Sequence, residues 1–132
     1  MKKKIIGMSI GILCGALCAK GAFVIAHRGE SKERPQNTLA AFDLAWKNGV
    51  SHVEADFHST KSGKIVCVHM PKEFKQFYGC EKKIEELSAE DAQNLKFSSD
   101  KWPEYKGAKI PLLEDVMRII PKAGGVLVLE IK

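Results

Sequence analysis

Charged and imidazole side chains stand toward the carboxyl ends of four apolar runs in this chain. The runs are Ile25-Ala26-His27-Arg28, Val53-Glu54-Ala55-Asp56, Val66-Cys67-Val68-His69 and Leu127-Val128-Leu129-Glu130-Ile131-Lys132. An unpaired charge or imidazole that becomes buried costs several kcal/mol, so a core strand carries one only where a partner meets it. The repetition therefore predicts that the four ends meet at one shared site.

Three of these groups are carboxylates, Glu54, Asp56 and Glu130. Like charges that converge are tolerated only when a cation or shared protons lie between them. All three offer oxygen ligands, and the chain has no cluster of cysteine thiolates beside them. Such a ligand set favours Mg²⁺ or Ca²⁺ over structural zinc. The pattern predicts a divalent metal site.

The remaining groups add acid/base chemistry and positive charge. His27 and His69 can act as a general acid and a general base. Arg28 and Lys132 supply fixed positive charge suited to an oxyanion such as phosphate. Each signal alone is weak, because a single histidine or a Glu-x-Asp pair is more often structural. Together, a metal, two imidazoles and two cations describe phosphoester cleavage.

The elements that position these groups follow an alternating order. We expect strands at 23–27, 53–57, 65–69 and 126–131, and helices at 39–47, 89–95 and 112–120. Strands that alternate with helices indicate an α/β fold built from parallel βαβ units. In each strand, one row of side chains begins apolar and turns polar at the carboxyl end. This is the distribution expected of a TIM-type (β/α) barrel, which carries its active site at that end.

Smaller signals fix the helix ends and leave one segment open. Asn37 or Thr38 can cap the first helix, and Asn48-Gly49 can end it. The irregular segment 71–109 is rich in aromatic and lysine residues, which could form a rim over the site or cover an edge of the core. Cys67 and Cys80 could form a disulfide, although Cys67 reads better as a small buried residue within a strand.

The same polar residues carry a resemblance to a known family. The ordered motifs are His27-Arg28-Gly29, Pro35-Gln36-Asn37-Thr38, Glu54-Ala55-Asp56, Val68-His69, Ile110-Pro111-Leu112-Leu113-Glu114 and Glu130-Ile131-Lys132. This set, spread over 23–132, resembles the glycerophosphodiester phosphodiesterases. The resemblance implies a metal-dependent TIM-barrel hydrolase of lipid metabolism, which converts small-molecule glycerophosphodiesters to glycerol 3-phosphate and an alcohol.

Carried over by position, the resemblance assigns a role to each candidate. It makes His27 and His69 the acid/base pair, Glu54, Asp56 and Glu130 the ligands of a Ca²⁺ or Mg²⁺ ion, and Arg28 and Lys132 the phosphate contacts. Two positions depart from the family. Glutamate is usual where this chain has Gln36, and aspartate is common where it has Met70.

The length of the chain predicts only part of such a barrel. Eight strands need roughly 250 residues, and four are expected here, so we interpret 23–132 as the N-terminal half of the domain. Either the sequence is a truncated fragment, or two copies self-associate to cover the open half barrel. A non-catalytic remnant or phosphate-binding module is the alternative function, and cleavage of a phospholipid is a third reading.

The first residues predict export. Met1-Lys2-Lys3-Lys4 is followed by an apolar run, which is typical of a signal peptide, here 1–22. The run is shorter than the roughly 20 residues of a membrane span, so we expect cleavage, no stable membrane span afterwards, and a periplasmic, extracellular or cell-surface protein. Cleavage removes four lysines and no acid from a formal charge of +5, which leaves +1. That charge gives no electrostatic case for nucleic acid.

Overall fold

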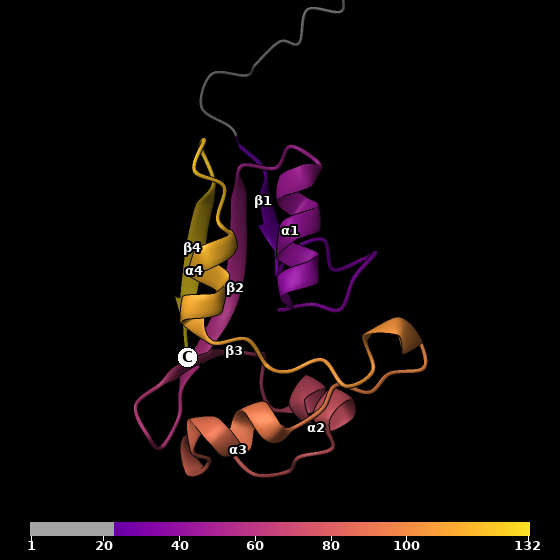
Figure 1. Ribbon diagram of the computed structural model, residues 1–132, viewed down its shortest axis with the longest axis vertical. Helices are drawn as coiled ribbons and strands as arrows, with labels where there is room; N and C mark the ends of the chain where they lie inside the picture. The colour runs from indigo at the N-terminus through magenta and orange to yellow at the C-terminus, as the bar shows by residue number, and fades with distance from the viewer. Residues whose placement is uncertain (1–22) are drawn as a thin grey trace, which may run out of the picture.

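The computed structural model describes residues 23–132, so the expected signal peptide lies outside them (Figure 1). The elements run in the order β1 (Ile25–His27), α1 (Leu39–Lys47), β2 (His52–Ser59), β3 (Ile65–Cys67), α2 (Lys72–Tyr78), the 3₁₀ turn η1 (Ile84–Glu86), α3 (Ala89–Asn94), the 3₁₀ turn η2 (Pro103–Tyr105), α4 (Leu113–Ile119) and β4 (Val126–Ile131).

The strand β2 is the centre of a parallel arrangement. Both β1 and β4 pair with it in parallel, one on each side. His27 stands opposite Glu54 across the first pair, and Asp56 stands opposite Glu130 across the second. The carboxyl ends of three strands therefore meet at one edge of the sheet, which confirms the predicted α/β class.

The strand β3 differs from the prediction. It runs antiparallel to the end of β2, with Phe57 opposite Cys67 and Ser59 opposite Ile65. A parallel partner needs a crossover of about a dozen residues or more, but the link 60–64 only closes a hairpin, in which the Thr60 backbone N–H donates to the Lys64 carbonyl at 2.8 Å. The interpretation of 65–69 as a further parallel strand was therefore wrong in direction.

The main core lies between the sheet and two helices. Val53, Ala55 and Phe57 are buried on the face of β2 that α1 and α4 cover (Figure 1). Facing them are Phe42, Ala45 and Trp46 of α1 and Val116 of α4. Because side chains alternate along a strand, this packing turns Glu54 and Asp56 to the opposite face.

The start of α1 is fixed as expected. Thr38 is the N-cap, and its hydroxyl accepts a hydrogen bond from the Ala41 backbone N–H at 3.2 Å. In the loop after β1, Gly29 has φ +81° and approaches α1 so closely that an added Cβ would lie 2.7 Å from the Ala41 carbonyl carbon. This contact holds the loop after β1 against the helix.

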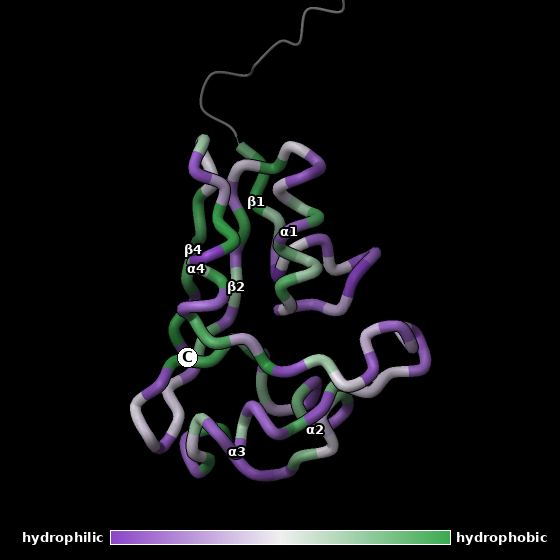
Figure 2. Tube along the Cα trace, in the orientation of Figure 1, coloured by the Kyte–Doolittle hydropathy of each residue, from purple (hydrophilic) through white to green (hydrophobic). Residues whose placement is uncertain are grey.

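The segment 71–109 forms a second, smaller core beside the end of β2. It contains α2, where the sequence predicts irregular chain, and this helix ends at Gly79 with φ +64°. The aromatic residues pack on one another, with the rings of Phe77 and Phe97 centred 5.3 Å apart. Figure 2 shows apolar residues concentrated along β1 and β4, and a more polar chain around α3. Most of these aromatic residues cover the core, as in the second of the two roles considered for this segment, rather than forming a rim over the site.

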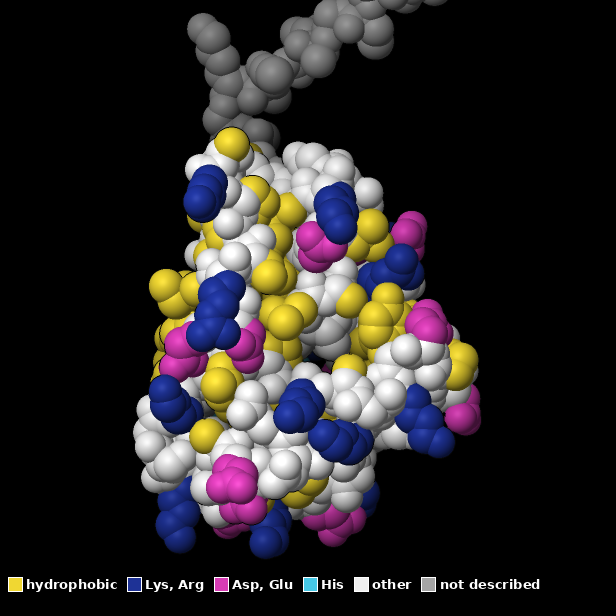
Figure 3. Space-filling model, viewed as in Figure 1, with side chains coloured by type: hydrophobic (Ala, Val, Ile, Leu, Met, Phe, Trp, Pro, Cys, Tyr) yellow, Lys and Arg dark blue, Asp and Glu magenta, His cyan; other side chains and the backbone are white. Residues whose placement is uncertain are grey.

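Apolar side chains remain exposed on the open sheet. Leu129 and Ile131 of β4 are 44% and 72% exposed, and Ile25 of β1 is 42% exposed. On the face drawn in Figure 3, acidic and basic side chains are interspersed rather than gathered by sign. Among residues 23–132, no helix has the length and apolar character needed to cross a bilayer.

Candidate active site

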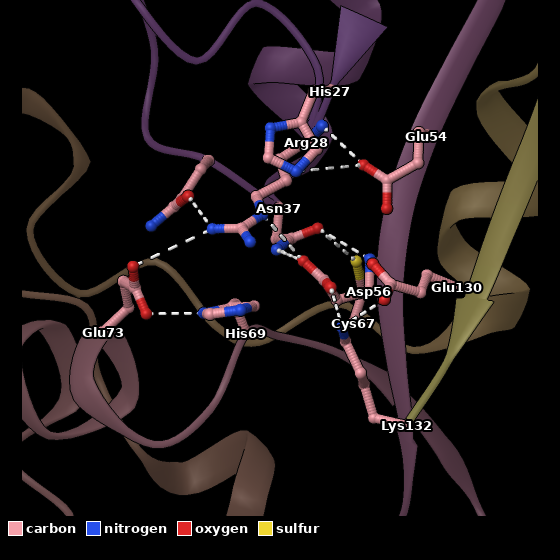
Figure 4. Close-up of polar contacts among 11 residues, drawn as sticks. His27, Arg28, Asn37, Glu54, Asp56, Cys67, His69, Glu73, Glu130 and Lys132 are labelled. Carbon is pink, nitrogen blue, oxygen red and sulfur yellow. Dashed lines mark hydrogen bonds and ion pairs between the residues drawn. The ribbon is translucent and has the colours of Figure 1, made fainter. Parts of the chain in front are cut away.

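The three predicted carboxylates come together at the carboxyl ends of β2 and β4. Glu54 and Asp56 project from one face of β2, and Glu130 projects beside them from β4 (Figure 4). One oxygen from each of the three lies within 4.8 Å of the others. The parallel register produces this arrangement, because it sets Asp56 directly opposite Glu130.

The donor atoms fit a divalent cation. Asp56 is fully buried, while Glu130 is 48% exposed. Within residues 23–132, Glu54 Oε1 is buried without a hydrogen-bond partner, and Asp56 Oδ1 makes no hydrogen bond but lies 3.5 Å from the Lys132 ammonium. A buried oxygen without a partner is costly unless a ligand or ion satisfies it. The set consists of oxygen atoms alone, which suits a hard cation such as Mg²⁺ or Ca²⁺.

The two carboxyl groups of β2 have pKa values shifted in opposite directions. Burial raises the pKa of Glu54, the backbone N–H of Arg28 opposes that rise, and repulsion from Asp56 adds to it. Burial alone would also raise the pKa of Asp56, but hydrogen bonding from Asn37 and the charge of Arg28 outweigh it and lower the pKa. Asp56 is therefore the more strongly ionised member of the set.

Arg28 contacts both carboxylates of β2. It has φ +59°, and its backbone N–H donates to Glu54 Oε2 at 3.0 Å. Its guanidinium Nε lies 2.9 Å from Asp56 Oδ2, and Nη1 donates to Gln36 Oε1 at 2.9 Å. The predicted phosphate contact thus lies beside the carboxylates, with its guanidinium already held in place.

Asn37, which the sequence suggests as a helix cap and as a motif member, also contacts Asp56 directly. Its Nδ2 donates to Asp56 Oδ2 at 2.9 Å, and its Oδ1 accepts from the Asp56 backbone N–H at 3.1 Å. The Cys67 thiol also donates to Oδ1, at 3.5 Å, and burial raises the pKa of that thiol. Within the described residues 23–132, both Cys67 and Cys80 are free. Asn37 therefore fixes the orientation of Asp56.

The two predicted acid/base histidines reach the site by different routes. His27 ends β1, is 67% exposed, and places Nε2 3.8 Å from Glu54 Oε2. His69 follows β3, which runs antiparallel to the end of β2 and so leads the chain back toward the carboxylates. Its Nδ1 lies 2.6 Å from Glu73 Oε2. Nothing in the sequence analysis singled out Glu73, because α2 was not predicted.

Lys132, the second predicted phosphate contact, lies among the carboxylates. Its Nζ donates to Glu130 and lies 3.5 Å from Asp56 Oδ1. The hydrogen bond to Glu130 raises the pKa of Lys132. His58, in contrast, is buried beside η1, with Nδ1 3.4 Å from Glu85 Oε1.

Comparison with known proteins identifies the family. Residues 27–132 match the sequence profile of the glycerophosphoryl diester phosphodiesterase family. The chain belongs to this family. A glycerophosphodiester phosphodiesterase of Caldanaerobacter subterraneus is 33% identical over 109 residues, which cover 83% of this chain and 44% of that protein. One from Bacillus subtilis is 30% identical over 100 residues, covering 70% and 34%.

Solved structures of the family share the fold. A phosphodiesterase of Oleispira antarctica in complex with the product sn-glycerol-3-phosphate is 32% identical, with a TM-score of 0.74 over 84% of this chain and 44% of that one. A glycerophosphodiester phosphodiesterase of Thermotoga maritima is 27% identical, with a TM-score of 0.66 over 84% and 44%. The chain therefore forms part of a TIM-type barrel, and it spans less than half the length of these relatives.

Proposed function

We propose that this chain carries the metal-binding and phosphate-binding half of a phosphodiesterase that hydrolyses glycerophosphodiesters to glycerol 3-phosphate and an alcohol. The observation that carries the proposal is the group of three carboxylates within 4.8 Å of one another, flanked by two cations and two imidazoles. Family membership supports the reaction class, and the product bound to the Oleispira antarctica relative supports the substrate class.

Glu54, Asp56 and Glu130 would hold the divalent ion, Ca²⁺ or Mg²⁺. When bound, such an ion polarises the phosphoryl oxygens and neutralises charge that develops on them. The contribution of this chain is to hold the carboxylates in place. Asn37 and Arg28 restrain Asp56 through the contacts at 2.9 Å, and the backbone N–H of Arg28 restrains Glu54.

His27 and His69 would move the protons. One imidazole removes a proton from the attacking hydroxyl, and the other protonates the leaving alkoxide. The two imidazole rings lie on different sides of the carboxylate group, with His27 beside Glu54 and His69 beside Glu73 (Figure 4). Arg28 and Lys132 would bind the phosphate oxygens with their fixed charge.

The setting of the activity is part of the same proposal. The lysine cap and apolar run of residues 1–22 support export to the periplasm, cell surface or medium, with 23–132 as the mature part of the domain. Exposed apolar residues on β4 support self-association, because an open sheet edge favours pairing with another chain. The physiological context would be glycerophospholipid metabolism.

The test is metal-dependent release of glycerol 3-phosphate from glycerophosphocholine by the purified chain. We expect activity that EDTA abolishes and that His27→Ala and His69→Ala each lower by at least about a hundredfold, the usual scale of acid/base catalysis. His52→Ala is the matched control, because the His52 ring contacts Ser51 and Phe23 away from the carboxylates. Turnover that survives both catalytic substitutions contradicts the proposal.

A non-catalytic module is the second candidate. It is favoured by Gln36 and Met70, which differ from the residues usual at these positions in the family, and by the exposed residues of β4. Calorimetry would separate the two, because a binding module takes up Mg²⁺ or Ca²⁺ without turning over substrate. A comparison of intact phospholipid with its deacylated diester distinguishes the phospholipid-cleaving reading in the same assay.

A further inference from the structure

We propose that Glu73 is a positioning residue that orients His69 and Arg28 together, an inference that rests on the proposed function. Its carboxylate would accept the Nδ1 proton of His69, so that Nε2 becomes the nitrogen available to substrate. The same carboxylate would restrain the guanidinium that binds phosphate. Glu73 would thus connect the acid/base group to the phosphate-binding group without touching the reacting atoms.

The two oxygens of Glu73 face different partners. Oε2 lies 2.6 Å from His69 Nδ1, and Oε1 lies 3.8 Å from Arg28 Nη1 (Figure 4). The side chains of Glu73 and His69 are 26% and 24% exposed, so water screens the pair less than it screens a fully exposed one. A carboxylate at this distance from a ring nitrogen selects one tautomer of the neutral imidazole.

The helix α2 explains why Glu73 stays in this position. Glu73 lies in its first turn, and the next residue, Phe74, is fully buried in the second core. The ring of Phe74 is centred 5.8 Å from that of Tyr78, which packs in turn on Phe97. Because Phe74 fixes the rotation of the helix, the side chain before it is held toward the site.

The residue beside His69 cannot take this role. Met70 directly follows the histidine, and a thioether is at most a weak hydrogen-bond acceptor. Glu73 lies four residues after His69, and the turn into α2 returns it to the imidazole. This chain therefore supplies from a helix the carboxylate that it lacks at position 70.

The ionisation of Glu73 agrees with the geometry. Partial burial alone would raise its pKa, but the hydrogen bond with His69 and the charge of Arg28 outweigh burial and lower the pKa. Glu73 is therefore an anion near neutral pH. As an anion it can accept the Nδ1 proton and also stabilise the imidazolium that forms when Nε2 takes up a proton.

The test reads the tautomer of His69 directly. We expect the ¹⁵N imidazole resonances of the full chain to show His69 with the proton on Nδ1. In Glu73→Gln, whose amide can donate to Nδ1, we expect the proton to move to Nε2. Glu73→Asp retains the charge and should retain part of the Nδ1 form. Glu81→Gln is the control, because it removes a carboxylate of the same segment that pairs with exposed Lys75 rather than with His69 or Arg28.

Kinetics provide the second readout. We expect Glu73→Gln to lower kcat about tenfold to a hundredfold, the scale typical of residues that orient a ligand or catalytic group, with a smaller change in KM and with Glu81→Gln unaffected. A wild-type His69 that carries its proton on Nε2 overturns the proposal, as does unchanged kcat in a Glu73→Gln chain whose tautomer has moved. A wild-type chain without turnover counts against the proposed function instead, because the tautomer is read without substrate.

Discussion

Replacing Asn37 by alanine should strongly destabilise this domain. The substitution removes the hydrogen bond of 2.9 Å to the fully buried Asp56 carboxylate, which is worth about 1.5–3 kcal/mol for a charged partner. It also leaves the Asp56 backbone N–H without a partner, because this group donates to Asn37 Oδ1 at 3.1 Å in the wild type. An unsatisfied buried donor costs about 1–3 kcal/mol. Alanine at φ +55° adds about 1 kcal/mol that asparagine largely avoids.

Together these effects predict a loss of about 3.5–7 kcal/mol, a large share of the roughly 5–15 kcal/mol by which domains are stable. Urea unfolding of the full chain, followed by circular dichroism in EDTA, measures the loss. Asn48→Ala is the matched control, because Asn48 is exposed at the end of α1 and should cost less than about 1 kcal/mol.

The pH dependence has a definite sign. The folded pKa of Asp56 is lowered from 3.8, with Asn37 as a cause, so its stabilising effect is full above about pH 4 and is lost as pH falls through the folded pKa. The difference between wild type and Asn37→Ala should therefore shrink in acid. Equal unfolding midpoints for Asn37→Ala and Asn48→Ala at pH 7 would refute the reasoning.

Three further predictions follow from the carboxylates, the loop after β1 and the open sheet. At pH 8, Mg²⁺ or Ca²⁺ at a hundred times its dissociation constant should stabilise the chain by about 2.7 kcal/mol. The same metal concentration should stabilise the chain less at pH 5, as measured by calorimetry, because the raised pKa of Glu54 makes protons compete with the metal. An equal effect in Asp56→Asn would exclude this site. Gly29→Ala should lower the free energy of unfolding in urea by at least about 1 kcal/mol more than Gly63→Ala, because both glycines have positive φ but a Cβ at Gly29 would clash with Ala41. Equal costs would mean that α1 shifts to relieve the clash. Leu129→Lys combined with Ile131→Lys should reduce association measured by light scattering, whereas Lys122→Glu, as an exposed control, should not.

Much of the site could be predicted because alternation along a strand is a local property. Glu54 and Asp56 share a face for that reason alone, and the same rule sets Glu130 on the matching face of β4. The cap at Thr38 is local too, since its hydroxyl bonds to a backbone group three residues ahead. Such features need no knowledge of the distant chain.

The features that were missed depend on longer paths. The antiparallel direction of β3 follows from the short link 60–64, which is too short for a crossover. The apolar run after the link resembles a core strand of a parallel sheet, so the pattern alone favours the wrong direction. Asn37 acts on Asp56 across 19 positions of sequence, and no periodicity reports such a contact. The position of Glu73 depends on α2, a short helix that the burial of Phe74 stabilises more than the helix propensity of its residues does.

The positive φ of Arg28 has a consequence for genetics. Its amide hydrogen contacts one carboxylate and its guanidinium another, yet a substitution scan replaces only the second contact. Glycine would relax the backbone at φ +59° and keep the amide, but it would leave the buried Asp56 carboxylate without its guanidinium partner. Proline alone among the natural residues removes the amide hydrogen. Replacing this amide by an ester would remove the N–H and would measure its contribution to holding Glu54, which no substitution of the Arg28 side chain measures.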